Sequence, residues 1–320
     1  MTSVDDPGTA ASRADLLSLI DRLATTRVGV LGDLLLDRFL FGISTRVSRE
    51  APVVVLRHDR TLEVPGGAAN TAANVRALGA NVSVFGAVGE DDAGRALDRA
   101  FAERGLEPSD RHLLPRADWE TTCKMRVLGG LRHATPQQLA RLDYERPLPP
   151  DPSWEDRLIQ AVTDAWETLD ALVLSDYGLG VITPRVVAAV RARRDSDGRR
   201  IPVVADAHLV DPMYTGLCSM TPNIGEVEET LHDESLAGDE DRLVAQGDEL
   251  RAQREFEALL VTRGKFGMTL LLGPDETLPA ARRDPGGQRF IHIPVFGGDQ
   301  VADVTGAGDT VIATYATALA

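Results

Sequence analysis

Residues 303–310 read DVTGAGDT and run directly into the apolar stretch VIATYATALA, residues 311–320. Gly306, Ala307 and Gly308 carry little or no side chain, so the backbone can adopt unusual angles and its amides can point together. The apolar stretch predicts a helix, and the start of a helix favours an anion because its amides are unpaired and its dipole is positive there. We therefore expect an anion cradle at Gly306–Gly308, with Asp309 beside it.

A carboxylate beside a phosphate cradle is suited to removing the proton from an attacking hydroxyl group. The simpler alternative is a capping turn with an aspartate at the helix start. The chain has no GxxxxGK[ST] pattern of a Walker loop and no GxGxxG after the first predicted strand. The octet therefore indicates phosphate chemistry outside those two families of nucleotide site.

Two further segments carry residues suited to sugar hydroxyls. In PGGAANTAAN, residues 65–74, Gly66 and Gly67 permit close backbone approach, and Asn70 can both donate and accept hydrogen bonds. The alternative for this segment is close helix packing through its alanines. In GDLLLD, residues 32–37, Asp33 and Asp37 follow a predicted strand and can bind a polyol, or simply form a turn.

The wider pattern alternates short apolar runs with helical periodicity. Strands are predicted at 27–33, 81–89, 171–178, 201–208, 218–223, 257–264 and 268–273, and helices at about 13–25, 66–80, 92–105, 154–170, 184–198, 224–232, 239–256 and 306–320. This alternation predicts an α/β fold with a doubly wound, mainly parallel sheet. Ligands bind such sheets beyond the carboxyl ends of the strands, where the candidates fall: Asp33, Asp37, Gly89, Asp176, Asp206, Asn223, Arg263 and Asp309.

Two stretches break the alternation. Residues 38–65 and 119–133 carry β-branched and alternating residues, which predicts strands outside the parallel sheet that cover the site as a small β-lid. Residues 1–12 are predicted to be a flexible lead, residues 13–320 one domain, and residues 280–288 a surface loop. Exposed lid edges are prone to pairing, so we expect a homodimer through the lid strands.

Composition narrows the class of protein. The chain has 320 residues and a formal net charge of −15, which argues against binding nucleic acid or an anionic membrane. Cys123 and Cys218 stand apart, without the spacing of a disulfide framework or a zinc site. The polar, acidic start is not a signal peptide, and no apolar run reaches membrane-span length. We expect a cytoplasmic protein.

The PGGAANTAAN and DVTGAGDT segments, in this order, resemble the two signatures of the ribokinase-like, PfkB-type carbohydrate kinases. The resemblance extends from about residue 28 to residue 320. The segments GDLLLDRFLFGISTRVSREAPVVVL and TTCKMRVLGGLRHATPQQLARLDYE resemble those of bacterial D-glycero-β-D-manno-heptose 7-phosphate kinases. The fold implied is the ribokinase-like fold, with a doubly wound sheet and a β-lid.

The resemblance implies transfer of the ATP γ-phosphate to the anomeric O1 of heptose 7-phosphate, giving heptose 1,7-bisphosphate for nucleotide-activated heptose. A bifunctional relative carries a nucleotidyltransferase domain after the kinase, and we expect the kinase activity alone here. The alternatives are a PfkB-type kinase for another sugar, sugar phosphate or nucleoside, and a non-catalytic sugar-phosphate-binding homologue. No nucleic-acid or membrane partner is expected.

The resemblance also assigns roles to residues. Asp309 is the expected base, and Gly306, Ala307 and Gly308 hold the transferring phosphate. The substrate residues implied are Asp37, Arg46, Gly66, Gly67, Asn70, Lys124, Arg126, Gln138, Arg141 and Asp176. ATP is expected at Asp206, Asn223, Glu226, Thr262, Gly264 and Gly267, with Mg²⁺ held at Glu226 and Asn223 through water.

In a chain this acidic, binding of the 7-phosphate needs local cations, and guanidinium groups suit bidentate contacts with phosphate. Lys124 and Arg126 alternate and so share one strand face, with Cys123 on the other; the alternative is a solvated lid face. Two positions depart from the heptose kinases, since Leu179 and His208 stand where lysine is common. Family members also continue beyond the position of Ala320. In them, that further segment supplies part of the adenine pocket and part of a monovalent-cation site. Asp303 and Thr305 would contribute to the same cation site.

Overall fold

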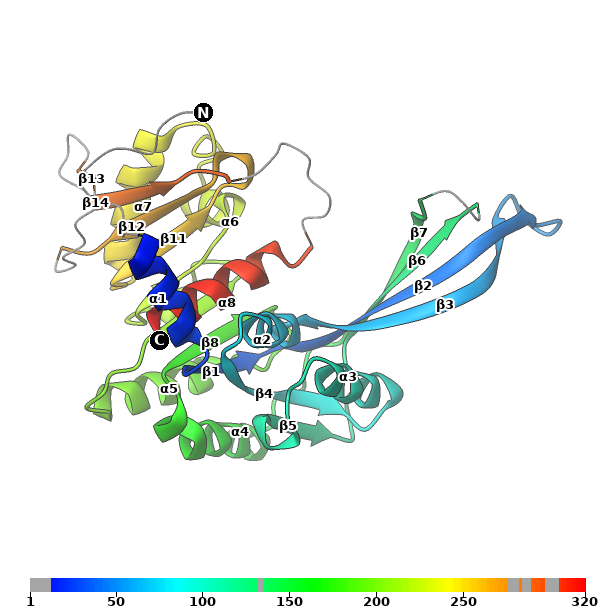
Figure 1. The fold of residues 1–320 in the computed structure, drawn as a ribbon, viewed down its shortest axis with the longest axis horizontal. Helices are drawn as coiled ribbons and strands as arrows, with labels where there is room; N and C mark the ends of the chain where they lie inside the picture. Colours follow the sequence, from blue (N-terminus) through cyan, green and yellow to red (C-terminus); the bar gives the residue numbers. More distant parts are fainter. Residues whose placement is uncertain (1–12, 132–134, 275–281, 284–288, 297–304) are drawn as a thin grey trace.

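The computed structural model describes residues 13–131, 135–274, 282–283, 289–296 and 305–320 (Figure 1). Within these residues a ten-stranded sheet has the order β13-β14-β12-β11-β10-β9-β8-β1-β4-β5. Its strands are β1 (Arg27–Gly32), β4 (Asn81–Gly89), β5 (Arg111–Arg116), β8 (Ala171–Asp176), β9 (Val203–Ala207), β10 (Ser219–Met220), β11 (Ala258–Thr262), β12 (Met268–Leu272), β13 (Arg282–Arg283) and β14 (Arg289–Ile293).

The sheet is parallel from β5 to β11 and antiparallel from β11 to β13. The mainly parallel sheet is therefore confirmed. Strands β5, β13 and β14 were not predicted from the sequence. Most of the predicted loop at residues 280–288 and the whole predicted lead at residues 1–12 lie outside the described residues.

Helices cover both faces of this sheet because alternate strand residues point to opposite sides. In β8, Ala171 and Val173 pack into one hydrophobic cluster, whereas Leu172 and Leu174 pack into the other. The helices are α1 (Arg13–Leu23), α2 (Ala68–Ala77), α3 (Asp92–Glu103), α4 (Pro152–Ala165), α5 (Pro184–Ser196), α6 (Ile224–Leu231), α7 (Glu240–Gln253) and α8 (Ala307–Leu319). A doubly wound core of this kind leaves the carboxyl ends of the strands open for a site.

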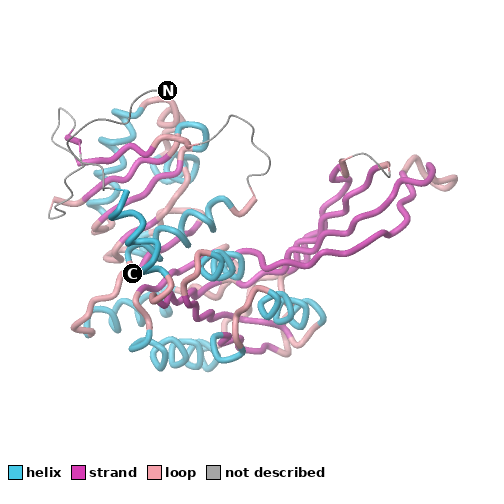
Figure 2. Tube along the Cα trace, viewed as in Figure 1, coloured by secondary structure: helices cyan, strands magenta, loops and turns pink. Residues whose placement is uncertain are grey.

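A second sheet projects from the first as the lid. It has the order β3-β2-β6-β7, from β2 (Leu34–Val47), β3 (Val54–Gly67), β6 (Cys123–Gly130) and β7 (Gln137–Tyr144). The sheet therefore includes most of residues 38–65 and part of residues 119–133, and also β7, which was not predicted. Figures 1 and 2 show its outer part extending away from the helices as strand and loop alone.

Small residues let α2 and α8 pack closely against each other. Ala69 and Ala72 of α2 and Ala313 and Ala316 of α8 are fully buried in one cluster. The Nδ2 of Asn74 donates a hydrogen bond to the Oγ1 of Thr310 across the same contact, at 3.3 Å. The contact brings together two segments that lie far apart in the sequence. The alanines therefore serve close helix packing, which was the alternative interpretation of this segment, and this packing is compatible with a ligand role for its other residues.

Both cysteines of the chain are free thiols. Cys123 and Cys218 are both buried and form no disulfide. Among the described residues, no helix is both long enough and apolar enough to cross a membrane.

We predict that Ala72→Leu lowers the free energy of unfolding by about 1–3 kcal/mol, because the added side chain overpacks the contact between α2 and α8. Alanine and leucine have similar helix propensities, so the change reports packing. Urea denaturation followed by circular dichroism measures it. Ala252→Leu, on the exposed face of α7, is the control and should stay within about 0.5 kcal/mol of wild type. Equal stability of the two variants would contradict the packing described.

Candidate active site

Asp309 occupies the first turn of α8, where the helix dipole is positive. Gly306 precedes the helix with φ 75°, a left-handed conformation that favours glycine, and Ala307 begins the helix. Asp309 itself is buried, with 4% of its surface exposed. The sequence therefore places a buried carboxylate directly beside a turn of small residues with free amides.

Three hydrogen bonds fix the Asp309 carboxylate. Its Oδ2 accepts from the Nδ2 of Asn70 at 2.7 Å, and its Oδ1 accepts from the hydroxyl of Tyr177 at 2.7 Å and from that of Thr71 at 3.3 Å. Burial raises the pKa of Asp309 above its ordinary value, while these bonds oppose the rise. A desolvated carboxylate held by three donors is oriented and remains a proton acceptor.

A polar cavity of about 140 Å³ lies next to Asp309, at the carboxyl ends of β8, β9 and β11. It is lined by Asp176, Tyr177, Asp206, Ala207, His208, Thr221, Asn223, Glu226, Thr262 and Gly308. Six residues that were predicted separately from the sequence therefore line one cavity: Asp176, Asp206, Asn223, Glu226, Thr262 and Gly308.

The carboxylates of this cavity repel one another. Burial, with the nearby charges of Asp309 and Glu226, raises the pKa of Asp206 to about 7. Burial also raises the pKa of Glu226 to about 7. Both carboxylates would hold their charge better beside a cation, so the cavity has the electrostatic character of a cation site.

Asn223 and Glu226 form a capping box at the start of α6. The Asn223 amide donates to Glu226 Oε2 at 2.8 Å, and the Glu226 amide donates to Asn223 Oδ1 at 3.1 Å. Within the described residues no three His, Cys, Asp or Glu side chains converge on one point that could hold a metal ion. Hard oxygen donors suit Mg²⁺, which keeps several waters and takes few protein ligands, so the donor set fits a water-mediated ion.

The expected nucleotide residues Thr262, Gly264 and Gly267 lie at the end of β11 and in the turn to β12, and of these Thr262 lines the cavity. The Thr262 amide donates to the Pro222 carbonyl at 2.9 Å, which ties β11 to the segment before α6. Gly264 and Gly267 both adopt positive φ, at 53° and 80°. Arg263 points elsewhere: it is buried, and its Nη1 donates to Glu240 at 2.8 Å.

Three cations of the lid, Lys124, Arg126 and Arg141, lie on one face. The cross-strand rows are Asp37–Lys124–Asp143 and, two residues along, Phe39–Arg126–Arg141. Residues in one row share a face, and residues two apart on a strand do as well. Lys124, Arg126, Arg141 and Asp37 therefore face the same side, whereas Cys123 takes the opposite one, as expected.

Lys124, Arg126 and Arg141 each have a carboxylate partner. Arg126 contacts Asp37, Arg141 forms a fork of bonds with Asp143 at 2.8 and 2.9 Å, and the Lys124 Nζ lies 3.7 Å from Glu145. Gly66 lies against Asp37, since a Cβ there would come 2.4 Å from its Oδ2. Gly67 has φ 55° before α2. The base of the lid thus needs both glycines.

Several predicted residues are not brought to this cluster. Arg46 is exposed and lies nine residues beyond Asp37 along β2, about 30 Å at the rise of an extended strand. Gln138 is exposed on β7, beyond a register shift. The buried amide of Gly89 donates to Thr121 and lines no part of the cavity. Asp303 lies outside the described residues, so the cation site expected at Asp303 and Thr305 stays a prediction.

The two departures from the heptose kinases have different surroundings. Leu179 is buried and apolar, and its amide donates to Asp33 at 3.1 Å. His208 is exposed, and its Nδ1 lies 3.8 Å from Glu226 Oε1. Position 179 therefore supplies no cation to the cavity, whereas position 208 keeps a nitrogen beside a carboxylate.

Sequence reasoning assigned no role to Tyr177 and Thr71, which both donate to Asp309. Tyr177 lies in the LSDYG segment, directly after the aspartate that ends β8. The sequence feature that could have identified Tyr177 as a site residue is its position directly after the end of a strand. Asp33, noted as a sugar ligand or a turn residue, is instead buried and accepts bonds from the amides of Tyr177, Leu179 and Val181.

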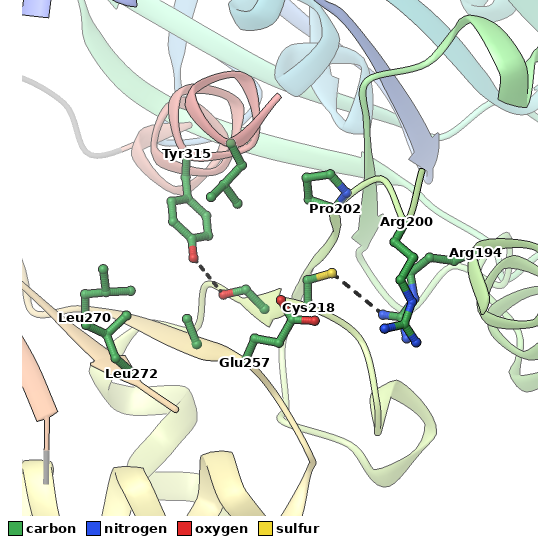
Figure 3. A pocket seen from close by; sticks show the side chains of 11 residues that line it. Arg194, Arg200, Pro202, Cys218, Glu257, Leu270, Leu272 and Tyr315 are labelled. Carbon is green, nitrogen blue, oxygen red and sulfur yellow. Dashed lines mark hydrogen bonds between the residues drawn. The ribbon is translucent and has the colours of Figure 1, made fainter. Parts of the chain in front are cut away.

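A larger cavity, of about 340 Å³, lies at the opposite ends of the strands (Figure 3). Ser219 and Ala258 begin β10 and β11 there, and the Tyr315 hydroxyl donates to the Ser219 hydroxyl at 3.1 Å. The sequence motifs and the clustered carboxylates lie at the carboxyl ends instead. We therefore place the candidate active site around Asp309.

Comparison with known proteins agrees with this geometry. Residues 26–320 match the pfkB family carbohydrate kinases. The chain is 40% identical over 292 residues to the bifunctional protein HldE of Pseudomonas syringae pv. tomato, covering 91% of this chain and 55% of that protein. HldE of Pseudomonas aeruginosa is likewise 40% identical over 293 residues. The chain spans about half the length of these curated relatives.

Solved structures share the fold. Phosphofructokinase-2 from Escherichia coli has a TM-score of 0.63 at 14% identity, over 90% of this chain and 84% of that one. Ribokinase from Arabidopsis thaliana has a TM-score of 0.60 at 18% identity, over 92% and 85%. The match of residues 26–320 to the family, with the two sequence signatures packed together at Asp309, shows that the chain belongs to the pfkB family of carbohydrate kinases.

Proposed function

We propose that this sugar kinase uses ATP and Mg²⁺ to phosphorylate D-glycero-β-D-manno-heptose 7-phosphate at the anomeric O1. The product is heptose 1,7-bisphosphate, a precursor of nucleotide-activated heptose. The observation that carries the proposal is the buried Asp309, fixed beside the Gly306–Gly308 turn and bonded to Tyr177, whose ring lies near Lys124 of the lid. The resemblance of the lid and signature segments to heptose 7-phosphate kinases, and the HldE relatives, support this substrate.

In the proposed reaction Asp309 takes the proton from O1. Oxygen O1 forms a bond to the γ-phosphorus as the bond from that phosphorus to the β–γ bridging oxygen breaks, and ADP leaves. The backbone amides at Gly306–Gly308 and the dipole of α8 stabilise the charge on the transferring phosphoryl group. Asn70, on the other oxygen of the carboxylate, keeps Asp309 in the orientation that this transfer needs.

The ATP phosphates are assigned to the 140 Å³ cavity, beside Asp206, Thr262 and Gly308. Glu226 and Asn223 would hold Mg²⁺ through water, and the bound ion would offset negative charge on the phosphates. A cation bound there would also favour the charged forms of Asp206 and Glu226, whose pKa values burial raises. A monovalent cation near Thr305 stays part of the prediction, as does a cytoplasmic location.

The 7-phosphate is assigned to Lys124, Arg126 and Arg141. In the free protein each of them has a carboxylate partner, so substrate binding exchanges a protein carboxylate for a phosphate. A neutral sugar needs no such set of cations. The apolar Leu179 favours one second candidate, a kinase for another phosphorylated sugar, because a cation common in heptose kinases is missing there.

The first test measures ADP release by a coupled assay with ATP, Mg²⁺ and heptose 7-phosphate, beside the unphosphorylated heptose. Turnover with the 7-phosphate alone is the expected result. Turnover with other phosphorylated sugars but not with this one would favour the second candidate. No turnover with any sugar, with the heptose phosphate still binding in calorimetry, would indicate a non-catalytic sugar-phosphate-binding protein.

We predict that Asp309→Asn lowers kcat about 10²–10⁴-fold, the usual contribution of a general base. The amide is nearly the same shape but does not accept the proton. Asp241→Asn is the matched control, an exposed aspartate in the first turn of α7, and should leave kcat unchanged. Full activity of Asp309→Asn would remove the assignment of the base.

We predict that Arg126→Gln raises KM for heptose 7-phosphate roughly 10–100-fold, because a charge-assisted bond to the phosphate is lost. KM for ATP should change little. Arg60→Gln is the control, an exposed cation farther along the lid in the cross-strand row of Phe41. If both KM values are unchanged in Arg126→Gln, the phosphate binds elsewhere.

We also propose a homodimer through the lid. Both edge strands of the lid sheet, β3 and β7, lack a neighbour on one side among the described residues, and the lid exposes Leu62, Leu139, Leu142 and Tyr144. An apolar, open-edged layer is stabilised by pairing with a second copy.

Light scattering should give twice the chain mass of 34.4 kDa for the wild type and a single chain mass for Leu142→Lys. Burying the new charge in the interface disfavours association. Leu78→Lys, at the C-terminal cap of α2, should stay dimeric. A monomeric wild type would contradict the proposal.

A further inference from the structure

Tyr177 stands at the centre of the candidate site. Its hydroxyl donates to Asp309 Oδ1 at 2.7 Å. The Nζ of Lys124, on the lid, lies 5.7 Å from the centre of its ring, and the ring of His208 meets it edge-on at 5.9 Å. One side chain therefore contacts the expected base, the lid and the nucleotide cavity.

The backbone around Tyr177 is held by a second buried carboxylate. Asp33 Oδ2 accepts from the amides of Tyr177 at 2.8 Å and Leu179 at 3.1 Å, and its Oδ1 accepts from that of Val181 at 3.1 Å. Asp33 sits between the end of β1 and the start of β2, and only 2% of it is exposed. It therefore anchors the loop after β8 to the point where the chain leaves the main sheet for the lid.

We propose that Tyr177 is a positioning residue for Asp309, and that Asp33 holds Tyr177 in place. The hydroxyl fixes one oxygen of the carboxylate while Asn70 fixes the other, so the base has one orientation toward the substrate. The role rests on the proposed function, in which Asp309 accepts the proton. Asp33 thereby acts through the loop and touches no substrate.

The electrostatic surroundings of Asp309 give Tyr177 a second effect. The charged groups that face Asp309 are Asp37 from β2 and Asp206 from β9, both negative, whereas Asn70 and Thr71 from α2 and Tyr177 are neutral donors. Burial and the charge of Asp309 raise the pKa of Tyr177, so its hydroxyl keeps its proton and donates. Losing this donor makes ionised Asp309 less stable and raises its pKa further.

The first experiment compares kcat of Tyr177→Phe with that of wild type across pH. We expect kcat to fall about tenfold, with little change in KM for ATP, because one charge-assisted hydrogen bond is lost. The loss should be larger at about pH 6 than at about pH 8, since the acid limb follows the pKa of the base. Tyr315→Phe is the control, because it removes a tyrosine hydroxyl that lies on α8 but toward the other end of that helix from Asp309. The pH profile of its kcat should match that of wild type.

The second experiment needs no kinase activity. A double-mutant cycle of Tyr177→Phe and Asp309→Asn, measured by urea unfolding, reports the coupling between the two side chains. A raised folded-state pKa makes stability fall as pH rises, and Tyr177→Phe raises that pKa further. The loss from Tyr177→Phe should therefore grow with pH in the wild-type background, reaching about tenfold in the unfolding constant, and stay constant with pH in Asp309→Asn.

The outcomes separate the two proposals. If wild type phosphorylates no sugar while the pH-dependent coupling is present, the proposed function fails and the tyrosine–aspartate interaction stands without a catalytic role. An active wild type whose Tyr177→Phe variant keeps both kcat and its pH profile overturns the positioning role. A stability loss that is equal at every pH in both backgrounds shows that Tyr177 only packs, and it also overturns the role.

Discussion

The packing of α2 against α8 is the constraint on which the rest of the site depends. Alanines on both helices allow the close approach, which places Asn70 and Thr71 beside Asp309. Larger side chains at this contact would separate a carboxylate from its donors and leave it buried without them, which is costly. The same small residues thus serve both stability and the geometry of the Asp309 carboxylate, so the packing and ligand interpretations of the alanine-rich segment do not compete.

Negative charge dominates this site. Asp37, Asp206, Glu226 and Asp309 surround the place where two phosphate-bearing ligands are proposed to bind, and burial raises the pKa of three of them. Such a site binds anions only with added cations. The lid supplies them from another sheet, and their carboxylate partners keep that face nearly neutral before binding. Substrate binding as proposed would therefore replace the carboxylate partners of the lid cations with the phosphate of the substrate.

The sequence was sufficient to predict the parallel sheet, the helices and six of the residues that line the cavity, because strand ends carry the polar residues and periodicity marks the rest. It did not reveal β7, whose residues are all exposed, so no alternation between buried and polar positions marks it. Nor did it reveal the bond between Tyr177 and Asp309, which joins residues 132 positions apart. Contacts of this kind follow from how helix and strand pack, and no local pattern encodes them.

The loop after β8 has leucine at position 179, where lysine is common in the heptose kinases, and its shape does not depend on that side chain. Its amide, not its side chain, bonds to Asp33, and the leucine side chain is buried. Any residue with a free amide satisfies the anchor, so a lysine can be replaced there without moving Tyr177 or Asp309. In the proposed reaction the charge missing at position 179 would come from other groups near the proposed phosphate sites. His208 beside Glu226 and Lys124 beside Tyr177 are two such groups. The loop therefore separates two requirements of the proposed function. Its backbone holds Tyr177 and so the Asp309 carboxylate, while side chains at a few positions set the charge that the proposed substrate would meet.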